Sequence, residues 1–219
     1  YQKSKIGSCR YSDMTVFSFH AVKQITSGEG GIVLTNDQGL YERLMAFRSH
    51  GITRDHSLFV NPNEEDWYYE MQSLGFNYRI TDFQCALASS QFGKLDFFVK
   101  RRREIVARYN QTFGPMGLFS VPVEKGDVKS SWHIYPLRVR KGRNRLFKKL
   151  REMGIEVNLH YIPVYLQPYY RQLEYLPGQC PRAEKYYEEA ITLPLFPKMT
   201  DQDVERVIDS VRNCYEEIK

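Results

Sequence analysis

Two short apolar runs stand near the start of the chain. Residues 14–19 (MTVFSF) are rich in β-branched and aromatic side chains, a pattern that predicts a short buried strand, and residues 31–34 (GIVL) predict a second strand. The residues between them are too few for a crossing helix, so they predict a loop, which contains Lys23 and the glycine cluster of residues 28–31. Residues 39–47 then place Leu40, Leu44 and Phe47 on one face of a predicted helix.

The middle of the chain predicts a long loop followed by a long helix. Residues 50–73 are polar and irregular, and long ordered loops are often functional. Thr81 and Gln84 have the spacing of a capping box, which predicts a helix start. Apolar side chains recur at helical spacing from Phe83 to Tyr109, so the pattern predicts one continuous helix.

A boundary is expected at the sequence GPMG, residues 114–117, giving one domain over 1–113 and another over 114–219. The second part predicts strands at 133–139 and 155–159, and helices at 143–153, 181–190 and 200–218. Gly154 is placed to end the first of these helices. This order of elements favours a small two-layer α+β domain.

Composition adds few constraints. The 219 residues are 42% hydrophobic and 26% charged, with a net charge of +5, as in ordinary globular proteins. Four widely spaced cysteines give neither a disulfide framework nor a zinc motif, which favours a reducing, cytoplasmic location. We find no signal peptide and no apolar run of about 20 residues that would cross a membrane. Because the chain begins with Tyr1 rather than Met, an upstream segment is expected.

Lys23 is a candidate for covalent chemistry, since a partly buried lysine can bind an aldehyde. The alternative is a solvated loop lysine. The glycine cluster lacks the pattern of a phosphate-binding P-loop and precedes a strand, so it predicts a tight backbone turn. The basic run at residues 100–103 suggests either a nucleic-acid contact or a solvated helix face, of which we favour the second. The histidines show no metal-ligand spacing, so no metal is expected.

Two further groups are candidate binding residues. Asn77 and Arg79 come just before a predicted helix start, where anions are attracted. The alternative is a turn followed by a surface arginine. His160 and Tyr161 follow a predicted strand and open a tyrosine-rich segment that suits a sugar or a base. That segment is equally consistent with an ordinary aromatic patch.

Six blocks together resemble a known family. In chain order they are FSFHAVKQITSGEGGIVLTND, RSHGITRD, LGFNYRITDFQCAL, RRREIVARYN, HYIPVYLQPYY and AITLPLFP. Blocks of this kind occur in this order in the DegT/DnrJ/EryC1/StrS sugar aminotransferases, which use pyridoxal 5'-phosphate (PLP). The resemblance implies an α/β PLP-dependent transferase of fold type I, with residues 1–113 as the C-terminal part of the large mixed-sheet domain. Residues 114–219 would be the small C-terminal α+β domain.

The resemblance also implies roles for single residues. Lys23 matches the lysine that binds the cofactor aldehyde, and Ser18 matches a serine that binds its phosphate. Asn77 matches an asparagine that reaches this phosphate from a partner subunit, in a homodimer with shared active sites. Arg79, His160 and Tyr161 resemble residues near the substrate.

The substrate expectation comes from the same comparison. The RSHGITRD and HYIPVYLQPYY blocks look most like members that aminate C4 of a UDP-linked 4-keto-6-deoxy-N-acetyl-hexosamine, with glutamate as donor, in pseudaminic acid biosynthesis. Another nucleotide-linked keto-sugar, such as GDP-4-keto-6-deoxymannose, remains an alternative. So does an inactive structural homologue. A dehydratase is disfavoured because Lys23 is present. The family's members are longer, so these 219 residues alone are expected to be inactive.

Overall fold

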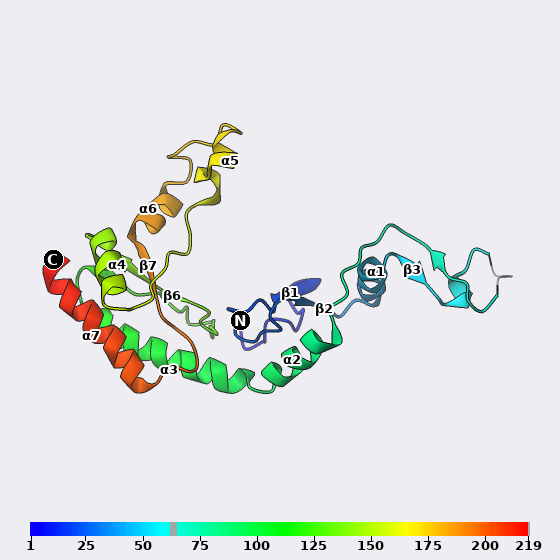
Figure 1. Cartoon of the computed structure of the whole chain (residues 1–219), viewed down its shortest axis with the longest axis horizontal. Helices are drawn as coiled ribbons and strands as arrows, with labels where there is room; N and C mark the ends of the chain where they lie inside the picture. Colours follow the sequence, from blue (N-terminus) through cyan, green and yellow to red (C-terminus); the bar gives the residue numbers. More distant parts are fainter. Residues whose placement is uncertain (62–64, 219) are drawn as a thin grey trace. The chain divides into compact units, whose positions relative to one another are not determined.

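The computed structural model describes residues 1–61 and 65–218 (Figure 1). These form two compact units, residues 1–94 and residues 95–219. The division differs from the one expected after residue 113. The reason is that the helix from Leu95 to Phe113 contributes Ile105, Tyr109 and Phe113 to the buried core of the second unit.

An antiparallel hairpin opens the first unit. Strand β1 (Met14–Ser18) pairs with β2 (Gly31–Thr35), with Ser18 opposite Gly31, so both predicted strands are confirmed. The burial expected of the first strand is wrong, because Val16 is 72% exposed; Ile32 and Val33 of β2 are exposed as well. The hairpin is a two-stranded sheet, which leaves its faces open in this unit.

Helix α1 (Gln38–Arg48) follows, capped by the Asp37 side chain, and confirms the predicted helix. The predicted loop at 50–73 is only partly irregular. It contains β3 (Ile52–Thr53), the 3-10 turn η1 (His56–Leu58) and β4 (Glu70–Met71), with β3 antiparallel to β4. The centre of the predicted loop, residues 62–64, lies outside the described residues.

The predicted long helix is two helices, α2 (Asp82–Phe92) and α3 (Leu95–Phe113). The capping box of Thr81 and Gln84 is confirmed at the start of α2. Gly93 ends that helix, and its backbone N–H still donates to the carbonyl of Ser89. A glycine in a helix interior is unfavourable, which the apolar spacing alone does not reveal.

The second unit contains a three-stranded antiparallel sheet in the order β5-β6-β7. The strands are β5 (Phe119–Ser120), β6 (Tyr135–Val139) and β7 (Ala190–Leu193). The helices are α4 (Arg143–Glu152), α6 (Pro181–Glu189) and α7 (Asp201–Ile218), and each was predicted. Gly154 follows α4 with a φ of 74°, as expected for a residue that ends a helix.

Several features of this unit differ from the prediction. Residues 155–159 are not a regular strand, because only Asn158 bridges Thr192 of β7. Strand β7 itself was not predicted. The intervening segment adds a 3-10 turn, η2 (Val164–Leu166), and the short helix α5 (Pro168–Arg171).

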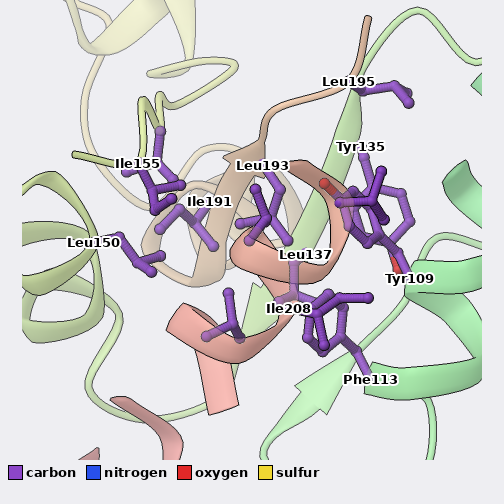
Figure 2. Packing of buried hydrophobic residues seen from close by; sticks show 14 of the residues in the cluster. Tyr109, Phe113, Tyr135, Leu137, Leu150, Ile155, Ile191, Leu193, Leu195 and Ile208 are labelled. Carbon is purple, nitrogen blue, oxygen red and sulfur yellow. The ribbon is translucent and has the colours of Figure 1, made fainter. Parts of the chain in front are cut away.

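The core lies between this sheet and the helices around it. Figure 2 shows Tyr109 and Phe113 of α3 packed with Tyr135 of β6. Leu150 of α4 and Ile208 of α7 belong to the same core. The buried tyrosine hydroxyls keep partners. Tyr109 donates to the carbonyl of Pro194 (3.0 Å) and Tyr135 to Asn110 Oδ1 (2.8 Å). Burial raises the pKa of both phenols, so they remain neutral donors.

Candidate functional site

A closed loop follows β1 and carries Lys23. At its neck, the Phe19 N–H donates to the Gly30 carbonyl (2.8 Å), and the Ser27 N–H donates to the Phe19 carbonyl (3.0 Å). The Thr26 hydroxyl donates to the same Phe19 carbonyl at 2.9 Å. These bonds hold the loop in register with the hairpin, because both of its ends are tied to the residue that follows β1.

Lys23 and Ser18 lie at the same end of this hairpin. The Lys23 side chain is half-buried, and its backbone N–H donates to the His20 carbonyl at 3.0 Å. Ser18 is exposed at the end of β1, and its hydroxyl accepts the His20 N–H at 3.2 Å. His20 therefore joins the two predicted cofactor-binding residues through its backbone.

The glycines in the loop are required by close backbone packing. Gly30 has a φ of +141°, and a Cβ there would lie 2.8 Å from Ser27 Oγ and 2.9 Å from Ile80 Cδ1. A Cβ on Gly31 would lie 2.9 Å from the Phe17 carbonyl oxygen. The predicted tight turn is thus confirmed, and it brings residue 80 against the loop.

Helix α2 contributes a second contact with the glycine turn. Gln84 Nε2 donates to the Glu29 carbonyl at 3.0 Å, so the first turn of α2 is bonded to this turn. Arg79 is exposed just before the Thr81 cap. The start of α2 therefore lies beside the loop.

Asn77 is held by a different element. It forms an antiparallel bridge with Ser49, directly after α1. Its neighbours Phe76 and Tyr78 donate their backbone N–H groups to the carbonyls of Phe47 (2.7 Å) and Arg48 (3.0 Å). Asn77 is exposed beside the C-terminal end of α1.

Two glycines allow the close backbone packing beside the bridge between Ser49 and Asn77. A Cβ on Gly51 would lie 1.8 Å from the Ser73 carbonyl oxygen, and a Cβ on Gly75 would lie 2.2 Å from the Gly51 nitrogen. The glycines of the RSHGITRD and LGFNYRITDFQCAL blocks therefore pack against each other.

His160 and Tyr161 belong to the second unit. The Nδ1 atom of His160 lies 2.8 Å from the hydroxyl of Thr192, which is buried on β7. Tyr161 is 71% exposed, and its ring lies 4.5 Å from that of His160 at an angle of 76°. These two residues follow the bridge at Asn158 rather than a regular strand, which corrects the expected position at a strand end.

The sequence interpretation missed two residues that shape these sites. Ser27 is buried and donates its hydroxyl to the Glu29 carbonyl at 2.7 Å, inside the glycine turn. Thr192 holds His160. Both lie inside blocks that carry the family resemblance, so the blocks were the available signal.

The basic run on α3 does not form a free cationic surface. Arg101 pairs with Asp201 (2.7 Å) and Arg103 with Glu124 (2.6 Å). Arg102 is buried and donates to the carbonyls of Trp132, His133 and Leu195. The expectation of a solvated face is therefore wrong for these three arginines, which bond within the unit.

Among residues 1–61 and 65–218, no three histidine, cysteine or acidic side chains are grouped as metal ligands. Within the same residues, no helix has the length and apolar character needed to cross a membrane.

The donor groups fit the cofactor that the resemblance implies. PLP requires a primary amine for its aldehyde and hydroxyl or N–H donors for its phosphate. Lys23 would supply the amine and Ser18 a hydroxyl, and both lie beside a turn whose glycines allow close backbone approach. This match rests on the chemistry of the groups.

Comparison with known proteins gives the same family. The model of the DegT/DnrJ/EryC1/StrS aminotransferase family matches residues 1–212. The chain is 39% identical to an uncharacterized protein of Methanocaldococcus jannaschii, over 99% of the chain and 57% of that protein. It is 33% identical to a UDP-4-amino-4,6-dideoxy-N-acetyl-beta-L-altrosamine transaminase of Campylobacter jejuni, over 100% of the chain and 56% of that protein.

Solved structures agree. Helicobacter pylori PseC, an aminotransferase of pseudaminic acid biosynthesis, matches with a TM-score of 0.87 and 32% identity, over 100% of this chain and 57% of that one. Spr1654 of Streptococcus pneumoniae in its PLP form matches with a TM-score of 0.88 and 29% identity, over 100% of this chain and 55% of that one.

The chain spans a little over half the length of the curated relatives that it matches. The family model nevertheless covers nearly all of it, and the fold is that of PLP-dependent sugar aminotransferases. The chain therefore belongs to the DegT/DnrJ/EryC1/StrS aminotransferase family, whose members depend on PLP.

Proposed function

We propose that the full-length protein is a PLP-dependent aminotransferase acting on a nucleotide-linked keto-sugar. The observation that carries this proposal is the position of Lys23 on a loop closed at Phe19, at the same hairpin end as Ser18. That geometry presents an amine and a hydroxyl on a fixed backbone.

Each residue then has a defined task. The Lys23 amine binds the cofactor aldehyde and, once released, moves a proton at the substrate carbon. The Ser18 hydroxyl binds the cofactor phosphate, joined by Asn77 of a second subunit in a homodimer. When bound, PLP supplies the electron sink for amino transfer.

Three residues are proposed as substrate contacts, each on its own chemistry: Arg79 in the first unit, and His160 and Tyr161 in the second. Arg79 provides a cation for a phosphate group, and Tyr161 provides an exposed ring that can pack on a sugar or a base. His160 is held by Thr192 and therefore has a fixed orientation.

We propose a UDP-linked 4-keto-6-deoxy-N-acetyl-hexosamine as substrate, aminated at C4 with glutamate as donor. The transaminase from Campylobacter jejuni and PseC from Helicobacter pylori support this choice. A GDP-linked 4-keto-sugar is the second candidate, because no contact described in the structure discriminates between the two bases.

The remaining parts of the proposal concern the whole protein. Residues 1–94 would be the C-terminal part of the large PLP-binding domain, and residues 95–219, which include α3, the small domain. The enzyme would act in the cytoplasm as a homodimer. The 219 residues alone would be inactive, since the chain spans a little over half the length of its relatives.

The test uses the full-length protein with PLP. Borohydride reduction followed by peptide mass spectrometry should place the cofactor on Lys23, and Lys23→Ala should abolish the cofactor absorbance band. Lys94→Ala, a change at an exposed lysine in the same unit, is the control. A band that persists in Lys23→Ala would reject the assignment, and no band in the parent would favour the inactive homologue.

Substrate choice needs a separate measurement. Glutamate and a panel of UDP- and GDP-linked 4-keto-sugars are incubated with the parent enzyme, and amino-sugar formation is followed by mass spectrometry. Amination of the GDP-linked sugar without the UDP-linked sugar would overturn the proposed substrate.

A further inference from the structure

One carboxylate in the second unit holds both ends of an exposed segment. Glu184, in the first turn of α6, accepts the hydroxyl of Tyr165 through Oε1. The same oxygen accepts the backbone N–H of Gly178 at 2.7 Å. Residues 165–178, which we call the aromatic loop, therefore have both ends bonded to the same carboxylate oxygen of Glu184.

The aromatic loop packs mainly on itself. The Tyr170 ring lies edge-on to that of Tyr169 (5.3 Å) and to that of Tyr175 (6.0 Å). Tyr169, Tyr175 and Leu176 are exposed, and none of the loop's residues belongs to the hydrophobic core cluster. In Figure 1 the loop is the yellow segment around α5, beyond α6. Glu184 thus attaches both ends of this loop to α6.

Tyr161 stands between two such attachments. On its N-terminal side, His160 is held by Thr192 of β7 (2.8 Å). On its C-terminal side, Tyr165 is held by Glu184 of α6. The exposed Tyr161 ring is thus carried on a short segment whose two ends are fixed to different elements of the unit.

The charges favour a permanent attachment over a switch near neutral pH. The Tyr165 hydroxyl and the Gly178 N–H lower the pKa of Glu184, which keeps the carboxylate ionised. Burial, followed by the bond to Glu184, raises the pKa of Tyr165 to about 12, so the phenol keeps its proton. Donor and acceptor therefore retain their roles over the physiological range.

We propose that Glu184 is a positioning residue for the nucleotide-sugar site. By fixing Tyr165 and Gly178, it holds the aromatic loop and keeps Tyr161 in place to contact the substrate. This inference rests on the proposed function, because it uses Tyr161 as a substrate contact. It assigns Glu184 no direct part in cofactor chemistry.

The experiment compares variants of the full-length enzyme. Glu184→Ala removes the acceptor, Tyr165→Phe removes one donor, and Glu184→Gln keeps an uncharged acceptor oxygen. Glu188→Ala, at an exposed carboxylate on the same helix, is the matched control. Three readouts are taken: the KM and kcat for the nucleotide-sugar, the rate of the glutamate half-reaction, and tryptic cleavage after Arg171 in α5.

Loss of a hydrogen bond to a charged group predicts a rise of about tenfold in the nucleotide-sugar KM of Glu184→Ala. The glutamate half-reaction should be unchanged, and cleavage after Arg171 should be faster. Tyr165→Phe should show a smaller rise, because the Gly178 bond remains, and Glu184→Gln should recover part of the loss. Glu188→Ala should behave as the parent.

The outcomes separate the two proposals. If Glu184→Ala leaves both the KM and cleavage unchanged, the positioning role is wrong. If it slows the glutamate half-reaction as much as the sugar reaction, Glu184 supports the structure generally and the positioning role is again wrong. If the parent neither binds PLP nor transaminates, the proposed function fails, and with it the substrate part of this inference. Cleavage after Arg171 would still show whether Glu184 anchors the loop.

Discussion

Gln84 in the first turn of α2 donates its side-chain amide to the backbone carbonyl of Glu29 in the glycine turn, at 3.0 Å. Its Oε1 atom accepts the N–H of Thr81 at 3.2 Å. One side chain therefore caps a helix and also fixes the loop that carries Lys23.

The two tasks of Gln84 can be separated. Gln84→Glu keeps the acceptor of the capping box and loses the donor to Glu29, whereas Gln84→Ala loses both. We expect Gln84→Glu to increase hydrogen exchange in residues 19–30 with little effect on α2. Gln84→Ala should also destabilise the protein by about 1 kcal/mol. Hydrogen exchange and urea unfolding of the full-length protein measure these effects; equal exchange in Gln84→Glu and the parent would contradict the prediction.

A substitution at Gly30 should disturb the same loop. Gly30→Ala places a Cβ 2.8 Å from Ser27 Oγ at a φ of +141°, so we expect a loss of stability of about 1–3 kcal/mol. The control is Gly126→Ala, where nothing lies within 4 Å of the added Cβ and no positive φ is found. Urea unfolding compares the two, and equal midpoints would refute the steric argument.

Arg102 is expected to be the most costly arginine to remove from α3. Arg102→Ala leaves the carbonyls of Trp132, His133 and Leu195 without this donor, so the free energy of unfolding should fall by about 3 kcal/mol. Burial lowers the pKa of Arg102, as expected for a cation without a carboxylate partner beside it. Arg108→Ala, which removes an exposed pair with Glu205, should cost under about 1 kcal/mol. A larger loss in Arg108→Ala would contradict this order.

The segment around Glu70 should respond to acid. Burial alone would raise the pKa of Glu70, but the N–H groups of Val60 (2.8 Å) and Asn61 (2.7 Å) outweigh burial and lower it. A lowered folded pKa contributes stability that is present above the ordinary value of 4.5 and is lost as the pH falls through the folded value.

The test for Glu70 is proteolysis of the segment as a function of pH. Cleavage between residues 54 and 72, followed with an acid-active protease, should rise as the pH falls below about 4.5. Glu70→Gln should remove most of this dependence, because it cannot ionise. A parent profile that matches that of Glu70→Gln would show that Glu70 does not control the segment.

The local sequence was sufficient for some elements. The capping box at Thr81, the glycine at 154 and the apolar spacing of α4 and α7 predicted helices that the structure confirms. These signals succeed because a helix is formed by hydrogen bonds between residues close in sequence. The family also followed from the sequence, because six blocks share one order with its members.

Tertiary contacts decided the strand at residues 190–193, the exposure of β1 and β2 and the anchoring bonds, which local sequence patterns did not predict. Residues 190–193 form a strand because they pair with β6, and the exposure of β1 and β2 depends on what covers them. The attachment of Tyr165 and Gly178 to Glu184, and of Gln84 to Glu29, has no local pattern. The sequence by itself determined several helices, whose hydrogen bonds join near neighbours in the chain, and the candidate lysine. The pairing of β6 with β7 and the bond from Gln84 to Glu29 join residues far apart in the chain, so only the tertiary structure decided them.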